Sequence, residues 1–152
     1  MRDRDGNITE FDVSGAGTGP GQGTNVAGIN PAGTTPGLYV DASGVTHGFV
    51  RAADGTITTF DVPGAGTGSG QGTFPANINP AGDVVGNYVD AGNVSHGFVR
   101  APNGAITTFD VPGAGTGPGQ GTIPVSNNPA GTITGYYFDG SGVEHGFLRT
   151  LN

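Results

Sequence analysis

Short apolar segments alternate with turn residues along the whole chain, and each apolar segment predicts a β-strand. In residues 24–72 the four segments are NVAGI, GLYVD, THGFVR and TITTFDV. The turns between them are NPAG, beginning at Asn30, then Asp41 to Gly44, then Asp54-Gly55. These sequences suit a type I turn, a three-residue loop with a glycine bulge, and a two-residue hairpin turn. Three tight turns between four strands predict an antiparallel meander.

The same segments recur with a period of 49 residues and without a net insertion. The HGF motif begins at His47, His96 and His145, and the NPAG motif begins at Asn30, Asn79 and Asn128. A unit of constant length is one structural module. We therefore predict one repeat domain over residues 1–152, with a partial unit at 1–23, complete units at 24–72 and 73–121, and a partial unit at 122–152.

The glycine-rich segment SGAGTGPGQGT has a glycine at every second position from Gly15 to Gly23. A Walker-type phosphate loop needs a lysine after its last glycine, and a dinucleotide fingerprint needs glycines at positions i, i+2 and i+5. The chain contains no lysine, and Pro20 stands where the last of those glycines would lie. We interpret the segment as the longer connection between modules, where glycine permits unusual backbone angles.

Four-stranded meanders joined by a longer crossover are the blades of a β-propeller. Alignment of the units places Met1 opposite Val50, so the chain is expected to begin with a fourth strand and to end, at HGFLRTLN, with a third. We therefore expect an all-β propeller with three blades per chain, whose ring closes by oligomerisation. A homodimer would have six blades and a homotrimer nine. The alternatives are a β-trefoil, which also has three four-stranded repeats, and an elongated array within a longer protein.

Composition narrows the classes of partner. Glycine and proline number 32 and 11, which without periodicity would suggest disorder, so the repeat pattern is what predicts a folded chain. The net charge of −7 repels nucleic acid and anionic membranes. No apolar run approaches the about 18 residues that span a bilayer, and the first ten residues lack the apolar region of a signal peptide. Neither nucleic acid nor a membrane is expected as a partner.

The segment from Ile78 to Ala101, INPAGDVVGNYVDAGNVSHGFVRA, resembles the bacterial extracellular repeats called the HAF family. That family is named for a His-Ala-Phe signature preceded by IN..G..vG. In this chain Gly48, Gly97 and Gly146 stand in place of the alanine. The resemblance extends over essentially all of the chain and implies an extracellular, propeller-like repeat protein, without implying an activity for any residue.

The recurring histidine is the first candidate for chemistry, because imidazole is a common metal ligand. In a propeller each histidine would lie on the third strand, about 10 Å from the innermost one, so the copies could not share one ion. The aspartates that precede and follow each HGF strand could form carboxylate pairs for calcium or hydrolysis, but they also suit turns. We expect no catalytic, metal or cofactor site.

The predicted turns also set which residues face one another. A three-residue loop at Ala42 to Gly44 places Tyr39 opposite His47, and a two-residue turn at Asp54-Gly55 places Phe49 opposite Phe60. We therefore expect one face of each blade to contain a structural motif in the interblade core. Its residues are Tyr39, His47 and Phe49, then Tyr88, His96 and Phe98, then Tyr137, His145 and Phe147.

The sequence thus favours a noncatalytic repeat protein that serves as a binding or structural scaffold. Equivalent shallow sites around a ring suit multivalent recognition, and glycans are the candidate ligand. Near-identical copies argue against an enzyme, which would need one distinct site. An extracellular enzyme acting on polysaccharides, or a fragment of one, is the alternative.

Overall fold

The computed structural model describes residues 6–150, in which all regular structure is β-strand and no helix occurs. The eleven strands are β1 (Gly23–Val26), β2 (Thr35–Val40), β3 (Thr46–Arg51), β4 (Ile57–Phe60), β5 (Gly72–Ile78), β6 (Val84–Val89), β7 (Ser95–Arg100), β8 (Ile106–Phe109), β9 (Gly121–Asn127), β10 (Ile133–Phe138) and β11 (Glu144–Arg149). The prediction of an all-β fold is confirmed.

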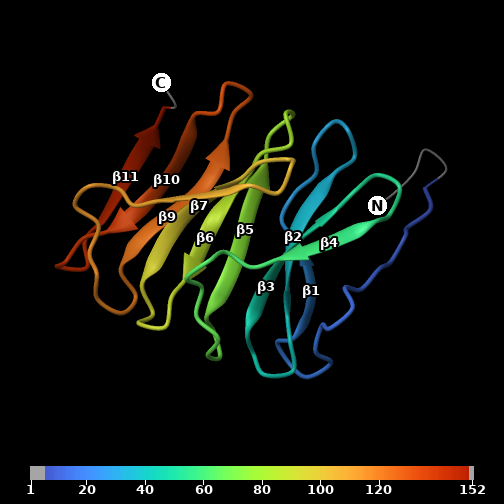
Figure 1. Ribbon diagram of the computed structural model, residues 1–152, viewed down its shortest axis with the longest axis horizontal. Helices are drawn as coiled ribbons and strands as arrows, with labels where there is room; N and C mark the ends of the chain where they lie inside the picture. The colour runs from blue at the N-terminus through green and yellow to red at the C-terminus, as the bar shows by residue number, and fades with distance from the viewer. Residues whose placement is uncertain (1–5, 151–152) are drawn as a thin grey trace.

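The strands form one open mixed sheet, which Figure 1 shows as an array with β1 near one end and β11 at the other. Strands β1 to β4 pair antiparallel in chain order, as do β5 to β8 and β9 to β11. Single parallel pairs, Thr46 with Gly72 and Ser95 with Gly121, join one group to the next. The sheet stays open within the described residues, unlike the closed barrel that the β-trefoil alternative requires.

The N-terminal segment was expected to form a fourth strand. Residues 1–5 lie outside the described part of the chain, and residues 6–13 contain only an isolated bridge residue at Ile8. By the 49-residue period, residues 8–11 correspond to β4 and β8, which pair along β3 and β7. None of the pairs among strands β1 to β11 includes residues 8–11, so the expected fourth strand is not formed within the described residues.

The hairpin between β2 and β3 has the predicted register. Asp41 and Val45 close a three-residue loop, and Tyr39 therefore lies opposite His47 and Gly37 opposite Phe49. The ring of Phe49 occupies the space above Gly37, where a Cβ atom would lie within 2.6 Å of the ring. Glycine is needed there because no side chain can share that space.

The register predicted for the next hairpin is wrong by one residue. The loop is closed by Ala52 N–H donating to Thr56 O, so it has three residues, with Gly55 at a φ of 96°. Phe60 consequently lies opposite Gly48, and Thr59 lies opposite Phe49. Since a shift of one residue moves a side chain to the other face of a strand, Phe60 lies on the face opposite to Phe49.

Packing between repeats explains why Phe60 is stable on that face. Phe60 makes an edge-to-face contact with Phe98 of the next repeat at 6.0 Å between ring centroids. Phe98 is fully buried in a cluster with Val62, Ile78 and Val84. The core therefore lies between neighbouring repeats, and each complete repeat contributes a phenylalanine to two such contacts.

The glycine-rich connection wraps around one glutamine side chain in each repeat. Gln71 Oε1 accepts a hydrogen bond from Gly68 N–H at 2.9 Å, and Gln71 Nε2 donates to Ala91 O at 3.3 Å. A Cβ atom added at Gly66 or Gly68 would collide with the glutamine amide. The alternating glycines thus leave room for this side chain, consistent with their interpretation as a connection.

Candidate functional site

The three histidines lie at equivalent positions on β3, β7 and β11, and each stacks on a tyrosine of the preceding strand. The ring centroids are 4.9 Å apart for Tyr39 and His47, 4.9 Å for Tyr88 and His96, and 5.0 Å for Tyr137 and His145. The hairpin register produces this stack, because it places the two rings directly opposite on one face of the sheet.

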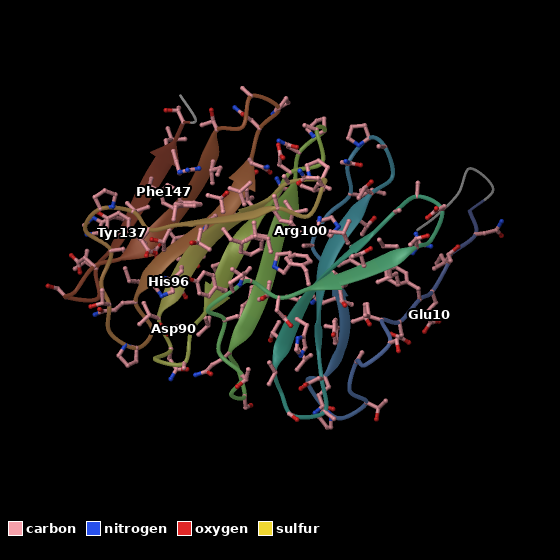
Figure 2. All side chains as sticks on the ribbon, in the orientation of Figure 1. Glu10, Asp90, His96, Arg100, Tyr137 and Phe147 are labelled. Atoms are coloured by element: carbon pink, nitrogen blue, oxygen red, sulfur yellow. The ribbon has the colours of Figure 1, made fainter. Side chains whose placement is uncertain are left out.

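Two aspartates flank the histidine in each of the first two clusters. His47 Nδ1 lies 3.0 Å from Asp61 Oδ1, and His47 Nε2 lies 3.5 Å from Asp41 Oδ2. The next repeat reproduces the arrangement, with His96 at 3.0 Å from Asp110 and 3.4 Å from Asp90. Figure 2 shows His96 and Asp90 close together on the second repeat.

The third cluster has a single carboxylate among the described residues. His145 Nε2 lies 3.2 Å from Asp139 Oδ2. Within residues 6–150 no carboxylate lies at its Nδ1 atom, where Asp61 and Asp110 approach the other two histidines. The His145 side chain is correspondingly more exposed, at 42% against 22% for His47.

The aspartate before each histidine strand is held by the hairpin loop that it initiates. Asp41 Oδ1 accepts hydrogen bonds from the N–H groups of Ser43 at 2.8 Å and Val45 at 2.9 Å, which leaves Oδ2 facing His47. The backbone bond from Val45 is the main cause that lowers the pKa of Asp41, and the bonds from Ser43 and His47 add to it. The predicted role as a turn initiator is confirmed, and the contact with histidine is additional.

The aspartate after β4 was missed as a partner of histidine. Asp61 and Asp110 follow their histidines by 14 residues in the sequence, and the hairpin brings each carboxylate back to the histidine ring. The constant spacing was the available signal. Burial, followed by the nearby charges of Asp61 and then Asp41, raises the pKa of Tyr39, and the same causes act on Tyr88 with Asp110 and Asp90.

This arrangement suits a clamp better than a metal site. The two carboxylates lie at opposite nitrogens of one imidazole, so their oxygens do not converge on a common point with it. Within residues 6–150 no group of three such side chains could hold a metal ion. The imidazole ring of His47 instead connects two segments of its repeat. It contacts Asp41 in the loop after β2 and Asp61 in the segment after β4.

The histidines do not belong to the interblade core, contrary to the expectation. The side chains of His47 and His96 are 22% and 23% exposed, whereas Phe49 and Phe98 on the same strands are fully buried. The two residue types are two positions apart and share a face, but the neighbouring repeat covers only the phenylalanine. The predicted motif therefore divides into a buried phenylalanine and a surface histidine with its stacked tyrosine.

A phenylalanine pair with edge-to-face geometry occurs three times along the chain, and an arginine guanidinium lies over one ring of each pair. Phe11 packs edge-to-face on Phe49 at 6.1 Å, and the guanidinium of Arg51 lies 4.9 Å from the Phe11 ring centroid. The second and third repeats repeat both contacts, with Phe60, Phe98 and Arg100, and with Phe109, Phe147 and Arg149. Burial lowers the pKa of Arg100.

No protein-family model matches the chain. Searches of curated proteins and of solved structures also found no match. Across residues 6–150, no helix is long and apolar enough to cross a membrane.

Acid is expected to weaken the fold through the aspartates that initiate the loops. The pKa values of Asp41, Asp90 and Asp139 are all lowered in the folded state from the ordinary value of 3.8, mainly by backbone hydrogen bonds. Their stabilising contribution is complete above that value and is lost as the pH falls below it. Urea denaturation of the wild type should show a free energy of unfolding that declines between about pH 5 and pH 2.

The matched variant replaces all three aspartates with asparagine, whose side-chain oxygen can still accept the loop hydrogen bonds. Its free energy of unfolding should be lower than that of the wild type at pH 5 and should depend less steeply on pH below 3.8. A variant that loses stability in acid as steeply as the wild type would contradict this assignment.

Proposed function

We propose that the protein is a noncatalytic scaffold in which the repeats are β-propeller blades and a second copy of the chain completes the ring. The observation that supports this most strongly is a difference in burial among equivalent positions. Residues that a neighbouring repeat covers inside the chain are exposed at the two ends of the array. A second copy would cover them with the same kind of surface.

The first repeat exposes apolar residues at the end of β1 and just after it. Val26 and Ile29 are 47% and 56% exposed, whereas their counterparts Pro75 and Ile78, one period later, are buried. Beside them is a hollow of about 630 Å³ that is also lined by Phe11 and other residues of this end. Exposed apolar surface of this kind marks an interaction site.

The last repeat exposes the complementary surface. Leu148 on β11 is 76% exposed, and its counterparts Val50 and Val99 are partly buried. Thr134 on β10 is also exposed, whereas the equivalent Pro36 and Val85 are fully buried against the following repeat. The outer edge of β11 has no neighbouring strand within the described residues, and unpaired edges are prone to intermolecular pairing.

These two surfaces lie at opposite ends of one chain (Figure 1), so a single copy does not bring them together. The contacts inside the chain support one way of fitting them together, because β2 packs against β5 and β6 packs against β9. By the same rule β10 of one copy would pack against β1 of another. Such a head-to-tail contact forms a closed ring when the rotation between copies closes.

The features that the three histidine clusters share support the noncatalytic part of the proposal. Each cluster has a stacked tyrosine and a turn-initiating aspartate in the same geometry. An active site would need one copy that differs in its reactive groups. The shared geometry instead suits a structural role, in which each cluster connects the segments of its own repeat.

Light scattering after size-exclusion chromatography tests the proposal. We expect a dimer of about twice the 15.0 kDa chain mass at micromolar concentration, with a trimer as the other closed form. Ile29→Asp places a charge on the exposed end surface and should yield a monomer. Thr107→Asp, at an exposed position on β8, is the matched control and should leave the dimer intact. A wild-type chain that stays monomeric would contradict the proposal.

A further inference from the structure

Asp12, near the N-terminal end of the array, has no histidine partner among the described residues. It precedes Asp61 by one period of 49 residues and is exposed. Asp61 and Asp110 each bind a histidine, but Asp12 makes no hydrogen bond or ion pair within the described residues. At the opposite end of the array, no residue of the described part of the chain gives His145 the carboxylate that Asp61 and Asp110 supply to the other histidines.

We propose that Asp12 of a second copy completes the His145 cluster, so that the contact between chains contains an interchain His-Asp site. This inference rests on the proposed self-association and specifies its geometry. The partner's Asp12 would approach His145 Nδ1, as Asp61 approaches His47 at 3.0 Å. His145 would then lie between that carboxylate and Asp139 of its own chain, with Tyr137 stacked on its ring.

The strand register follows from the two complete hairpins. In both of them the residue after the histidine pairs with the phenylalanine that precedes aspartate, Gly48 with Phe60 and Gly97 with Phe109. The same register on β11 pairs Gly146 with the partner's Phe11. The remaining pairs would be Phe147 with Glu10, Leu148 with Thr9, and Arg149 with Ile8.

This pairing would add a short strand along the open edge of β11. It would cover Leu148, which is 76% exposed, and Ile8, which is 82% exposed. Figure 2 places Glu10 at one end of the molecule and Phe147 toward the other, so the proposed pair forms between chains and not within one. Peptide recognition by strand addition uses the same main-chain hydrogen bonds.

Backbone hydrogen bonds between repeats predict two further hydrogen bonds across the proposed contact between chains. Gly70 N–H donates to Gly44 O, and Gly119 N–H donates to Asn93 O. One period earlier, Gly21 N–H would donate to the partner's Gly142 O. Likewise Thr46 N–H donates to Gln71 O and Ser95 N–H to Gln120 O. The equivalent hydrogen bond between chains would run from Glu144 N–H to the partner's Gln22 O.

A double-mutant cycle on the dissociation constant of the dimer tests the interchain pair. Asp12→Asn and His145→Gln should each weaken association, and the double variant should weaken it by less than the product of the two effects. The expected coupling is about two- to fivefold in Kd, the range of exposed ion pairs. The control cycle, Asp12→Asn with His96→Gln, should show no coupling, because His96 already has both of its carboxylates.

Disulfide cross-linking tests the register independently. The chain has no native cysteine, so only the introduced thiols can form a disulfide. Thr9→Cys combined with Leu148→Cys places the two thiols opposite each other, within the Cα separation that a disulfide needs. Oxidation should give a covalent dimer on a nonreducing gel. Glu10→Cys with Leu148→Cys is the matched control, in which the thiols lie on opposite faces and should form little cross-link.

The outcomes separate the two proposals. Coupling between Asp12 and His145 together with the Thr9–Leu148 cross-link would support the interchain site. A dimer that shows neither would overturn the site and its register while leaving self-association in place. A chain that remains monomeric at every concentration tested would overturn both.

Discussion

Replacement of Phe98 by alanine is expected to lower the free energy of unfolding by about 3–5 kcal/mol, the usual cost of removing a buried phenylalanine. Phe98 has no exposed surface, packs with Val62, Ile78 and Val84, and meets the edge of Phe60. Loss of the ring leaves a cavity between two repeats that the flanking strands cannot fill. Urea denaturation followed by circular dichroism measures the effect, and the melting temperature should fall by on the order of 10 °C.

Phe147→Ala is the matched control, because the same residue occupies the same position one repeat later and is only half-buried. Both variants are measured in the Ile29→Asp background, which keeps the chains from covering one another's ends. Phe147→Ala should then cost about 1–2 kcal/mol, in proportion to its smaller buried area. Equal costs for the two variants would show that neighbouring repeats do not determine burial at this position.

Replacement of Gly72 by alanine is expected to destabilise the protein by about 4 kcal/mol or more, which places it among exceptional substitutions. Gly72 has a φ of 119°, a conformation that strains any side chain. Its added Cβ would also collide with the carbonyl oxygen of Thr46, the residue with which Gly72 forms the parallel pair between repeats. Since backbone atoms block the space, relief would require breaking that pair.

Gly70→Ala separates the two causes. Gly70 also has a positive φ, 80°, but nothing lies within 4 Å of its added Cβ. Its expected cost is therefore only the conformational one, about 1–2 kcal/mol. Thermal denaturation of both variants would check the difference, and a cost for Gly72→Ala no larger than that for Gly70→Ala would contradict the steric argument.

Local turn chemistry explains which features the sequence could predict. The loop after Tyr39 begins with an aspartate whose side chain accepts bonds from Ser43 and Val45 and ends at Gly44 with a φ of 83°. Those preferences involve only neighbouring residues, so they fix the hairpin and the pairing of Tyr39 with His47 wherever the hairpin lies in the fold. The next loop also has its aspartate and glycine, but two loop lengths fit that pair.

Packing between repeats decided the remaining features. The three-residue loop that closes on Thr56 sends Phe60 to the face that meets Phe98, and that choice depends on a residue 38 positions away. The pairing of Asp61 with His47 depends on the same hairpin register. A glycine at positive φ is compatible with either loop, so local preference alone could not select between them.

The sequence by itself determined the 49-residue module, its strands, its turns and the all-β class, because periodicity and turn residues act through local backbone geometry. Only the tertiary structure decided that Phe49 is buried while His47, two positions earlier on the same face, stays at the surface. It also decided that Ile78 is covered while Ile29 is not. The physical reason is that burial depends on which neighbour lies above a residue, and equivalent residues in a repeat have different neighbours at its ends.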